Sequence, residues 1–336
     1  MKARRLWFIE PKVIEIREHE LSPLASDEVL VRTVASGISA GTEMLVYRGQ
    51  LPQDVPLDAS IKAFQGLDGS YPLPYGYACV GVIEALGSAL NKAIKTKKVF
   101  AFQPHASHFI CKLDQLIFLP DGMSDETGTF LANMETAVNF LIDGAAQKHE
   151  NVAIIGVGIV GQLLNSLLNQ YPLNKITVID TIKARRDLAA QEKLTFSFTP
   201  DAREVIAVDI DEKFDLIFEL SGNPEVLNLA IELSGFAGRI IVGSWYGNKS
   251  ASINLGGAFH RNRLKIISSQ VSTISPEHAL EWTKAKRLKK ALALLTELDA
   301  EKYITHRFPL SQADKAYQLL DREPDKTLQI ILTYED

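Results

Sequence analysis

Three glycines in the segment VAIIGVGIVGQLL have a spacing that can bind phosphate groups. Gly156, Gly158 and Gly161 follow an apolar run and open an amphipathic one, which predicts a tight turn between a strand and a helix. The first glycine permits the turn, the second lets a pyrophosphate approach the backbone, and the third lets the helix pack closely on the strand. The N–H groups of Ile159 and Val160, at the start of that helix, would then face the phosphates.

A carboxylate follows at the distance expected of a ribose-binding residue. The run KITVID ends at Asp180, 19 residues after Gly161. A carboxylate there accepts hydrogen bonds from both ribose hydroxyls and repels the 2′-phosphate of NADP, so we predict NAD as the cofactor. The basic residues that come next, Lys183, Arg185 and Arg186, keep NADP open as an alternative. We place Arg185 beside the adenine.

Composition and charge exclude several classes of partner. The chain has 336 residues and a net charge of −5, whereas nucleic acids and anionic membranes favour a basic face. Its two cysteines are too few for a disulfide framework, which favours a reducing cytoplasm. No uncharged apolar run approaches the roughly 20 residues of a membrane helix. We expect a soluble, cytoplasmic protein whose partner is a small-molecule substrate.

The pattern of apolar and turn-forming residues changes near residue 120. Before it, short β-branched segments separated by Gly, Pro and Asp predict hairpins and a partly closed β-barrel. After it, strand and helix patterns alternate, which implies a doubly wound parallel sheet with right-handed crossovers. The fold class is therefore α/β, with a β-domain at 1–120, a Rossmann domain at 121–270, and a remainder that returns to the first domain. Ligands of such sheets bind beyond the carboxyl ends of the strands, so we expect the active site in the cleft between the domains.

Four segments resemble the medium-chain dehydrogenase/reductase superfamily, which includes the zinc-type alcohol dehydrogenases: VASGISAGTEMLVYRG, LPYGYACVGVIEALGS, FDLIFELSGNPEVLNLAI and YITHRFPLSQADKAYQLL. The resemblance covers essentially the whole chain. It implies a GroES-like catalytic domain at 1–120, completed by 271–336, and NAD(P)-dependent oxidoreductase activity. Three further segments look most like the branch that includes the bacteriochlorophyllide dehydrogenases: LANMETAVNFL, QPHASHF and FHRNRLKIISSQVS.

The same resemblance implies further cofactor contacts. Ser221 and Gly222 correspond to the loop beside the nicotinamide ribose, and Gly243 lies in the strand segment GRIIVGSW. Ser269 and Gln270 lie at the polar end of LKIISSQVS, where they would contact the carboxamide or the substrate or, equally, cap the strand. Pairing of GRIIVGSW or its neighbour between two chains would build a homodimer or homotetramer.

The positions of the zinc ligands depart from the family pattern. Zinc-dependent members use a Cys in GICG, a His in GHE and a later Cys or Glu. The corresponding positions here hold Ser39 or Ala40, then Tyr77, and Asn133 near the third, although a shift of two residues would place Glu135 there. Apart from Glu135, these are Ser, Ala, Tyr and Asn side chains, which are poor zinc ligands. The region of the four-cysteine structural zinc lobe has only Cys111, so we predict that both zinc sites are absent.

Without zinc, another group must stabilise an alkoxide and handle its proton. Tyr77 occupies the position of the zinc histidine, and an unperturbed phenol pKa of about 10 suits a general acid in ketone reduction. Glu135 would set its protonation or bind substrate, and Thr42 matches the hydroxyl that relays the proton in zinc members. His105 is a further candidate. For each of these residues a structural role stays open; Tyr77, for example, would only fill the space left by the metal.

Three functions remain. The first is a zinc-independent, NAD-linked alcohol dehydrogenase or ketone reductase. The second is an enoyl or quinone reductase, which needs no metal and usually prefers NADPH, so that Asp180 counts against it. The third is a protein that binds NAD without turnover, against which the polar residues around the predicted site count mildly.

Overall fold

The computed structural model describes residues 1–52, 57–58, 60–200 and 213–334. They form two compact units: Met1–Ala132 with Ala293–Asp336, and Asn133–Leu292. We expected the divisions at 120 and 270. The first unit extends past 120 because Gly128, in the short helix α2 (Asp125–Gly128), packs on apolar side chains of that unit. The second extends past 270 because Arg287 is bonded within it.

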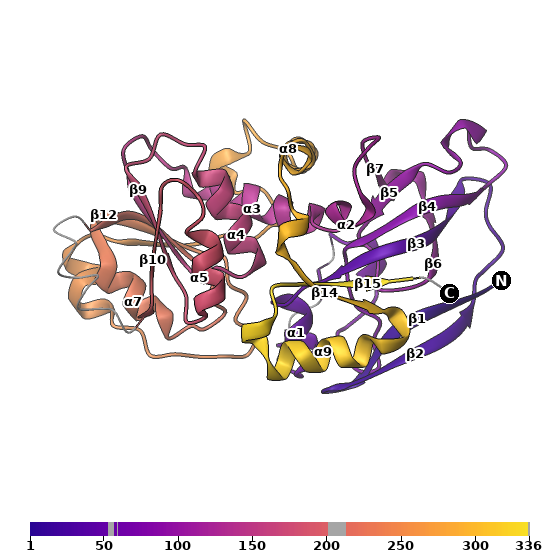
Figure 1. The fold of residues 1–336 in the computed structure, drawn as a ribbon, viewed down its shortest axis with the longest axis horizontal. Coiled ribbons are helices and arrows are strands. Elements are labelled where there is room, and N and C mark those ends of the chain that lie inside the picture. The colour runs from indigo at the N-terminus through magenta and orange to yellow at the C-terminus, as the bar shows by residue number, and fades with distance from the viewer. Residues whose placement is uncertain (53–56, 59, 201–212, 335–336) are drawn as a thin grey trace. The chain divides into compact units, whose positions relative to one another are not determined.

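The first unit is built from antiparallel hairpins, as its sequence pattern predicts. One sheet has the order β14-β15-β3-β4-β5-β7, with β6 also paired to β3, and β1 and β2 form a separate hairpin (Figure 1). Only β14 and β15 run parallel among these described pairs. The strands are β1 (Lys2–Glu10), β2 (Val13–Glu20), β3 (Glu28–Ile38), β4 (Cys79–Leu86), β5 (Lys98–Ala101), β6 (His108–Lys112), β7 (Leu116–Phe118), β14 (Ile304–Pro309) and β15 (Gln329–Thr333).

Two helices complete the core of the first unit and carry residues of interest. Helix α1 (Thr42–Tyr47) follows β3 directly and buries five of its six side chains. Helix α9 (Ala313–Arg322) buries Ala313, Ala316, Tyr317 and Leu320, a spacing that places them on one face. The rings of Tyr47 and Tyr317 stack at 5.4 Å between these helices, so α1 and α9 are joined by aromatic packing.

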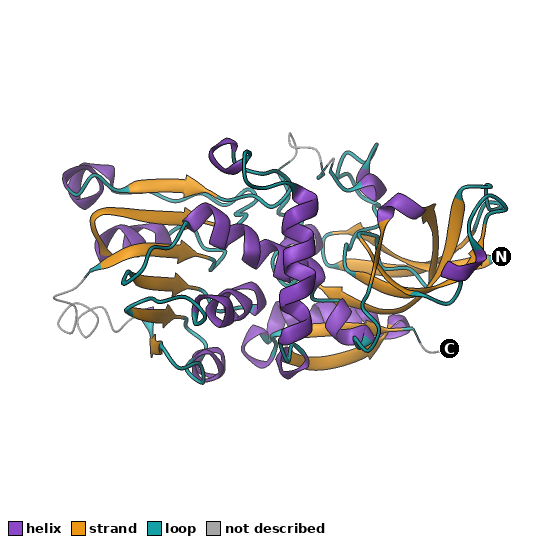
Figure 2. Cartoon of the chain, turned by 90° about the horizontal axis from the view of Figure 1, so that it is seen from above, coloured by secondary structure: helices purple, strands orange, loops and turns teal. Residues whose placement is uncertain are grey.

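The second unit is a six-stranded parallel sheet of order β10-β9-β8-β11-β12-β13, which confirms the α/β class. Helices accompany the strands, as the view from above also shows (Figure 2). The strands are β8 (Asn151–Ile155), β9 (Lys175–Ile179), β10 (Thr195–Phe198), β11 (Phe214–Glu219), β12 (Ser234–Val242) and β13 (Lys265–Ser268). The helices are α4 (Ile159–Leu168), α5 (Lys183–Ala189) and α7 (Val226–Leu233), with most of α3 (Leu131–Gly144) and of α8 (Lys284–Glu297).

The strand order creates a switch point between β8 and β11. The chain runs outward from β8 to β9 and β10, then returns to β11 on the other side of β8 and continues outward to β12 and β13. In open parallel sheets ligands bind beyond the carboxyl ends of the strands at such a point. The glycine-rich turn directly follows β8 and therefore lies there. Among the helices of the described ranges, none combines the length and apolar character that a membrane span requires.

Candidate functional site

The glycine-rich turn has the geometry that its sequence predicts. Gly156 has a φ of +95°, and a Cβ there would lie 2.6 Å from the backbone of Leu220. A Cβ on Gly161 would lie 2.3 Å from the carbonyl oxygen of Gly156, so helix and strand touch at this residue. A Cβ on Gly158 would meet only a guanidinium nitrogen of Arg185, at 3.9 Å. The first and third glycines are thus needed for packing, and the second leaves the backbone open beside a cation.

Asp180 braces this turn. Its Oδ2 accepts a hydrogen bond from the N–H of Val157 at 2.8 Å, and its Oδ1 accepts one from Ile182 at 2.8 Å. Arg186 donates to the carbonyl of Asp180 at 2.7 Å. The carboxylate is 8% exposed, and each of its oxygens keeps a further lone pair for a ribose hydroxyl. The bracing contacts were not foreseen from the sequence.

A second carboxylate organises the end of β11. Glu219 is fully buried and accepts hydrogen bonds from the N–H and the hydroxyl of Ser221 and from the hydroxyl of Tyr246. Burial, followed by the charge of Glu219, raises the pKa of Tyr246. The predicted Ser221–Gly222 loop is therefore held at the switch point by Glu219 and Tyr246, neither of which the sequence indicated.

The neighbouring loop after β12 is held by contacts of a different kind. Gly222 donates its N–H to the hydroxyl of Ser244 at 2.9 Å. Gly243 donates to the carbonyl of Glu219 at 3.0 Å, and a Cβ on Gly243 would lie 2.3 Å from the ring of Phe140. Gly243 is thus a position of close packing between β12 and α3.

Glu135 lies in a buried salt bridge. Its Oε1 accepts from Nε and Nη2 of Arg287, at 3.1 and 2.9 Å, and the guanidinium also bonds Asn139. Burial raises the pKa of Glu135, although the charge of Arg287 opposes the shift. Ser269 is buried beside this group and Gln270 is exposed. Glu135 belongs to the second unit, whereas Thr42, Tyr77 and His105 belong to the first.

The structure brings Tyr77 and Thr42 together. The hydroxyl of Tyr77 hydrogen-bonds the side chains of Ser39 and Thr42, and all three residues are half-buried. Burial, and then the charge of Glu43, raise the pKa of Tyr77 to about 12. Tyr77 is therefore a protonated phenol at neutral pH, with two hydroxyls within reach of its own.

Behind this cluster lies a chain of buried polar groups. Glu43 accepts hydrogen bonds from Nε2 of His105 at 2.9 Å and from the hydroxyl of Tyr317. Nδ1 of His105 lies 2.7 Å from the hydroxyl of Ser36, which lies 2.7 Å from that of Tyr334. Every group has a partner if Tyr334 donates to Ser36, Ser36 to Nδ1, and Nε2–H to Glu43, which corresponds to a neutral imidazole. His105 is fully buried, a position that fits a residue acting through Glu43.

Gly76 makes room for this histidine. It has a φ of +114°, and a Cβ there would lie 2.6 Å from the ring of His105. Any larger residue at 76 would displace either the imidazole or the backbone that leads into Tyr77. In the part of the chain that the structure describes, no group of three or more His, Cys, Asp or Glu side chains is arranged to hold a metal ion.

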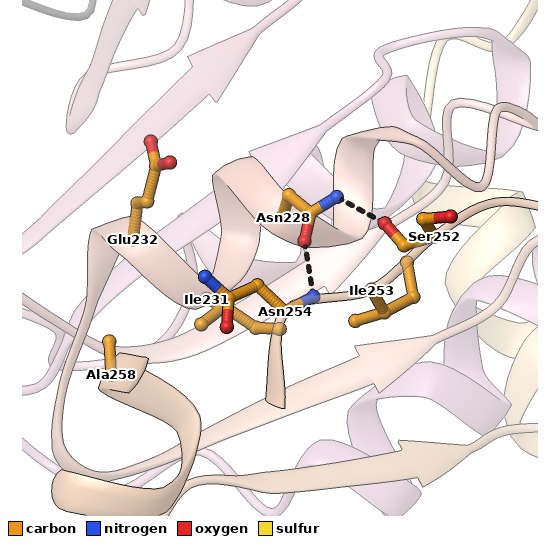
Figure 3. A pocket seen from close by; sticks show the side chains of 7 residues that line it. All are labelled: Asn228, Ile231, Glu232, Ser252, Ile253, Asn254 and Ala258. Carbon is orange, nitrogen blue, oxygen red and sulfur yellow. Dashed lines mark hydrogen bonds between the residues drawn. The ribbon is translucent and has the colours of Figure 1, made fainter. Parts of the chain in front are cut away.

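A separate cavity of about 470 Å³ lies beside α7 in the second unit. Asn228 donates to the carbonyl of Ser252 at 2.8 Å and accepts from the N–H of Asn254 at 2.9 Å, so that its amide ties α7 to the segment after β12 (Figure 3). None of the predicted site residues lines this cavity.

No family model matches the chain. An uncharacterized zinc-type alcohol dehydrogenase-like protein of Escherichia coli is 23% identical over 354 residues, with 96% of each chain covered. The 2-desacetyl-2-hydroxyethyl bacteriochlorophyllide A dehydrogenase of Cereibacter sphaeroides is 25% identical over 344 residues, again with 96% of each covered. A crystal structure described as a short chain alcohol dehydrogenase from Escherichia coli, complexed with NADH, has a TM-score of 0.81 at 18% identity and covers 99% of each chain. The chain therefore has the α/β fold of the medium-chain alcohol dehydrogenases, a GroES-like unit combined with a Rossmann unit.

Proposed function

We propose that this protein is an oxidoreductase that transfers a hydride between NAD and an alcohol or ketone without zinc. The proposal is carried by one observation in each unit: the second has a dinucleotide-type turn braced by Asp180, and the first has a protonated phenol, Tyr77, bonded to two hydroxyls. The names of the relatives, which are dehydrogenases, support it.

The residues of the second unit fit a dinucleotide. The open backbone at Gly158 and the N-terminus of α4 at Ile159 would hold the pyrophosphate. Asp180, at the end of β9, would accept from the ribose hydroxyls. Its negative charge would repel a 2′-phosphate, which favours NAD over NADP even with Arg185 nearby.

The residues of the first unit do not fit zinc. Tyr77 takes the position of the zinc histidine, and a phenol is a poor zinc ligand compared with a thiolate, an imidazole or a carboxylate. The nearest carboxylate and imidazole, Glu43 and His105, are bonded to each other and fully buried. The remaining oxygens, on Ser39 and Thr42, are neutral hydroxyls, which are weak zinc ligands.

The proposed chemistry follows from these groups. Bound nicotinamide would supply or accept the hydride. In ketone reduction the substrate oxygen gains negative charge, and Tyr77 would donate its proton to that oxygen. Ser39 and Thr42, hydrogen-bonded to the phenol, would orient it. Because the phenol pKa is raised, Tyr77 is better suited to ketone reduction than to removing a proton from an alcohol at neutral pH.

The purified protein would be titrated with NADH and NADPH by fluorescence, then assayed with a panel of alcohols, ketones, enones and quinones. We expect NADH to bind about tenfold more tightly than NADPH, a difference of about 1.4 kcal/mol. Turnover of a ketone should persist after chelation and should not rise when zinc is added. Tight NADPH binding with enone turnover, NAD binding without turnover, or activity lost to a chelator and restored by zinc would contradict the proposal.

A further inference from the structure

The loop after β13, Ser269–Thr273, is shaped by polar side chains of two helices. Ser269 donates its N–H to the carbonyl of Val242 at 2.9 Å. Its hydroxyl accepts from the amide of Asn139 at 2.9 Å and donates to Asp143. The hydroxyl of Ser269 is therefore already bonded to α3, which favours the strand-end cap over direct contact with a ligand.

Gln270 points the other way. It is exposed, and its amide bonds the next turn of the loop, where Oε1 accepts from the N–H of Ser272 at 2.7 Å. The loop thus has one anchored side chain, Ser269, followed by an exposed, folded-back one. The rest of the loop is held through hydrogen bonds to its backbone carbonyls.

Arg287 on α8 donates the hydrogen bonds that hold those carbonyls. It is fully buried, and its Nη1 donates to the carbonyl of Thr273 at 3.0 Å while its Nη2 donates to that of Val271. The same guanidinium bonds Asn139 at 2.6 Å and pairs with Glu135 on α3. A planar fork with five donors can satisfy this set, whereas a lysine ammonium cannot span it.

The strand order places this loop on the nicotinamide side of the sheet. Asp180 follows β9, on one side of β8, whereas β11, β12 and β13 lie on the other side. A dinucleotide with its pyrophosphate at the turn after β8 and its adenosine ribose at Asp180 must extend its nicotinamide half across the ends of β11 to β13. The loop Ser269–Thr273 follows the last of these strands.

We propose that Arg287 is a positioning residue for the nicotinamide half of the cofactor, because it fixes from behind the loop that meets this half. The inference rests on the proposed function, since it requires NAD in the second unit. Arg287 itself touches no ligand; it holds the carbonyls of Val271 and Thr273 and, with Asn139, the position of Ser269.

The test compares two ligands that differ in the nicotinamide ring. NADH and ADP-ribose share the adenosine and pyrophosphate, and their dissociation constants would be measured for the wild type and for Arg287→Lys. The lysine keeps a charge for Glu135 and loses the contacts to the loop. We expect NADH to bind about tenfold more weakly, the effect of one good hydrogen bond, with the affinity for ADP-ribose unchanged. Asn139→Ala, which leaves no charge unpaired, should show the same selective loss and serves if Arg287→Lys fails to fold.

The control is Lys289→Met, which removes an exposed cation from the same helix and should change neither affinity. An equal loss of both ligands in the variants, or no loss of either, would show that Arg287 only stabilises the fold and would overturn the inference. If the wild type bound neither ligand, the proposed function would fail and this inference with it. A wild type that binds both ligands separates the two outcomes.

Discussion

Tyr77 has two properties of a residue that can donate a proton at neutral pH. Its pKa is raised to about 12, so it keeps its proton throughout the physiological range, and it has two hydroxyl neighbours that hold its orientation. Fully buried tyrosines such as Tyr317 also have a raised pKa, yet they are enclosed by the core. Partial burial, in place of complete burial, together with the hydroxyl pair distinguishes Tyr77 from them.

We expect Tyr77→Phe to lower the turnover of ketone reduction by about tenfold or more, because a general acid contributes at least that much. NADH binding should be unchanged, since the substitution lies in the first unit. Steady-state kinetics and a fluorescence titration check the two parts. Tyr75→Phe, which removes a neighbouring phenol hydroxyl in the core, is the matched control. Wild-type turnover in the Tyr77 variant would remove Tyr77 from the mechanism.

The charge of Glu43 offers a pH test of the same residue. Burial contributes most to the raised pKa of Tyr77, Glu43 comes next, and Asp58 adds a smaller part, against which Ser39 and Thr42 act. An acid works while protonated, so the rate falls as pH rises through its pKa. For the wild type, kcat/KM should therefore not change with pH up to about pH 11. In Glu43→Gln the charge is lost, the pKa falls, and the high-pH limb of kcat/KM should move to lower pH.

Asp58→Asn should move this limb less than Glu43→Gln does, because its contribution is smaller. The two variants together separate a charge effect from a packing effect, since only Glu43 also bonds His105 and Tyr317. If kcat/KM falls at the same pH in the wild type, Glu43→Gln and Asp58→Asn, the phenol of Tyr77 does not control the rate.

At the scale of elements, local sequence was enough for five of the six described strands of the second unit; the four-residue strand β10 (Thr195–Phe198) was missed. Strands such as Asn151–Ile155 are continuous apolar runs of the kind found in parallel sheets, and the glycine spacing fixes the turn that follows. The predictions of these strands and of the turn are confirmed. Helix α1 (Thr42–Tyr47) was missed, since six residues are too few for a periodic pattern and tertiary packing holds them.

The buried hydrogen-bonded groups behind Tyr77 could not be predicted from local sequence, because their partners lie far apart in the chain. Ser36 bonds His105, 69 positions away, and Tyr334, 298 positions away. The contact with Tyr334 depends on the antiparallel pairing of β15 with β3, which brings Leu332 opposite Ser36. The contact with His105 depends on the pairing of β6 with the same strand. A single sequence carries no signal for either register. His105 was selected only as a reactive residue type, and its partners came from the fold.

The charge of Asp180, beside the glycine-rich turn, predicts which cofactor the protein prefers. In Asp180→Asn the negative charge is lost, while the amide oxygen still accepts from one of the two backbone N–H groups that the carboxylate braces. We expect the affinity for NADPH relative to NADH to rise about tenfold, because the repulsion of the 2′-phosphate is removed. Asp187→Asn, an exposed position on α5 paired with Lys183, is the control. An unchanged ratio would show that another residue selects the cofactor.

At the scale of the whole molecule, the parallel sheet leaves two edges, β10 and β13, among the described strands. An exposed edge offers unpaired N–H and C=O groups to another strand, and a second copy of the chain is one way to satisfy them. Apolar side chains are exposed at and near the β13 edge, including Ile266 at 37% and Phe236 on the neighbouring strand at 72%. We therefore propose that two copies associate through β13.

The charged substitution Ile266→Lys tests this association, because a pair of lysines facing each other across the interface would repel. By analytical ultracentrifugation we expect the wild type at twice the 37.2 kDa of one chain, or a higher multiple, and the variant at a lower one. Phe196→Lys is the matched control: it places the same charge on β10, at the opposite edge, where Phe196 is 56% exposed. If the wild type sediments as a monomer, or if only the Phe196 variant dissociates, the edge at β13 is not the interface.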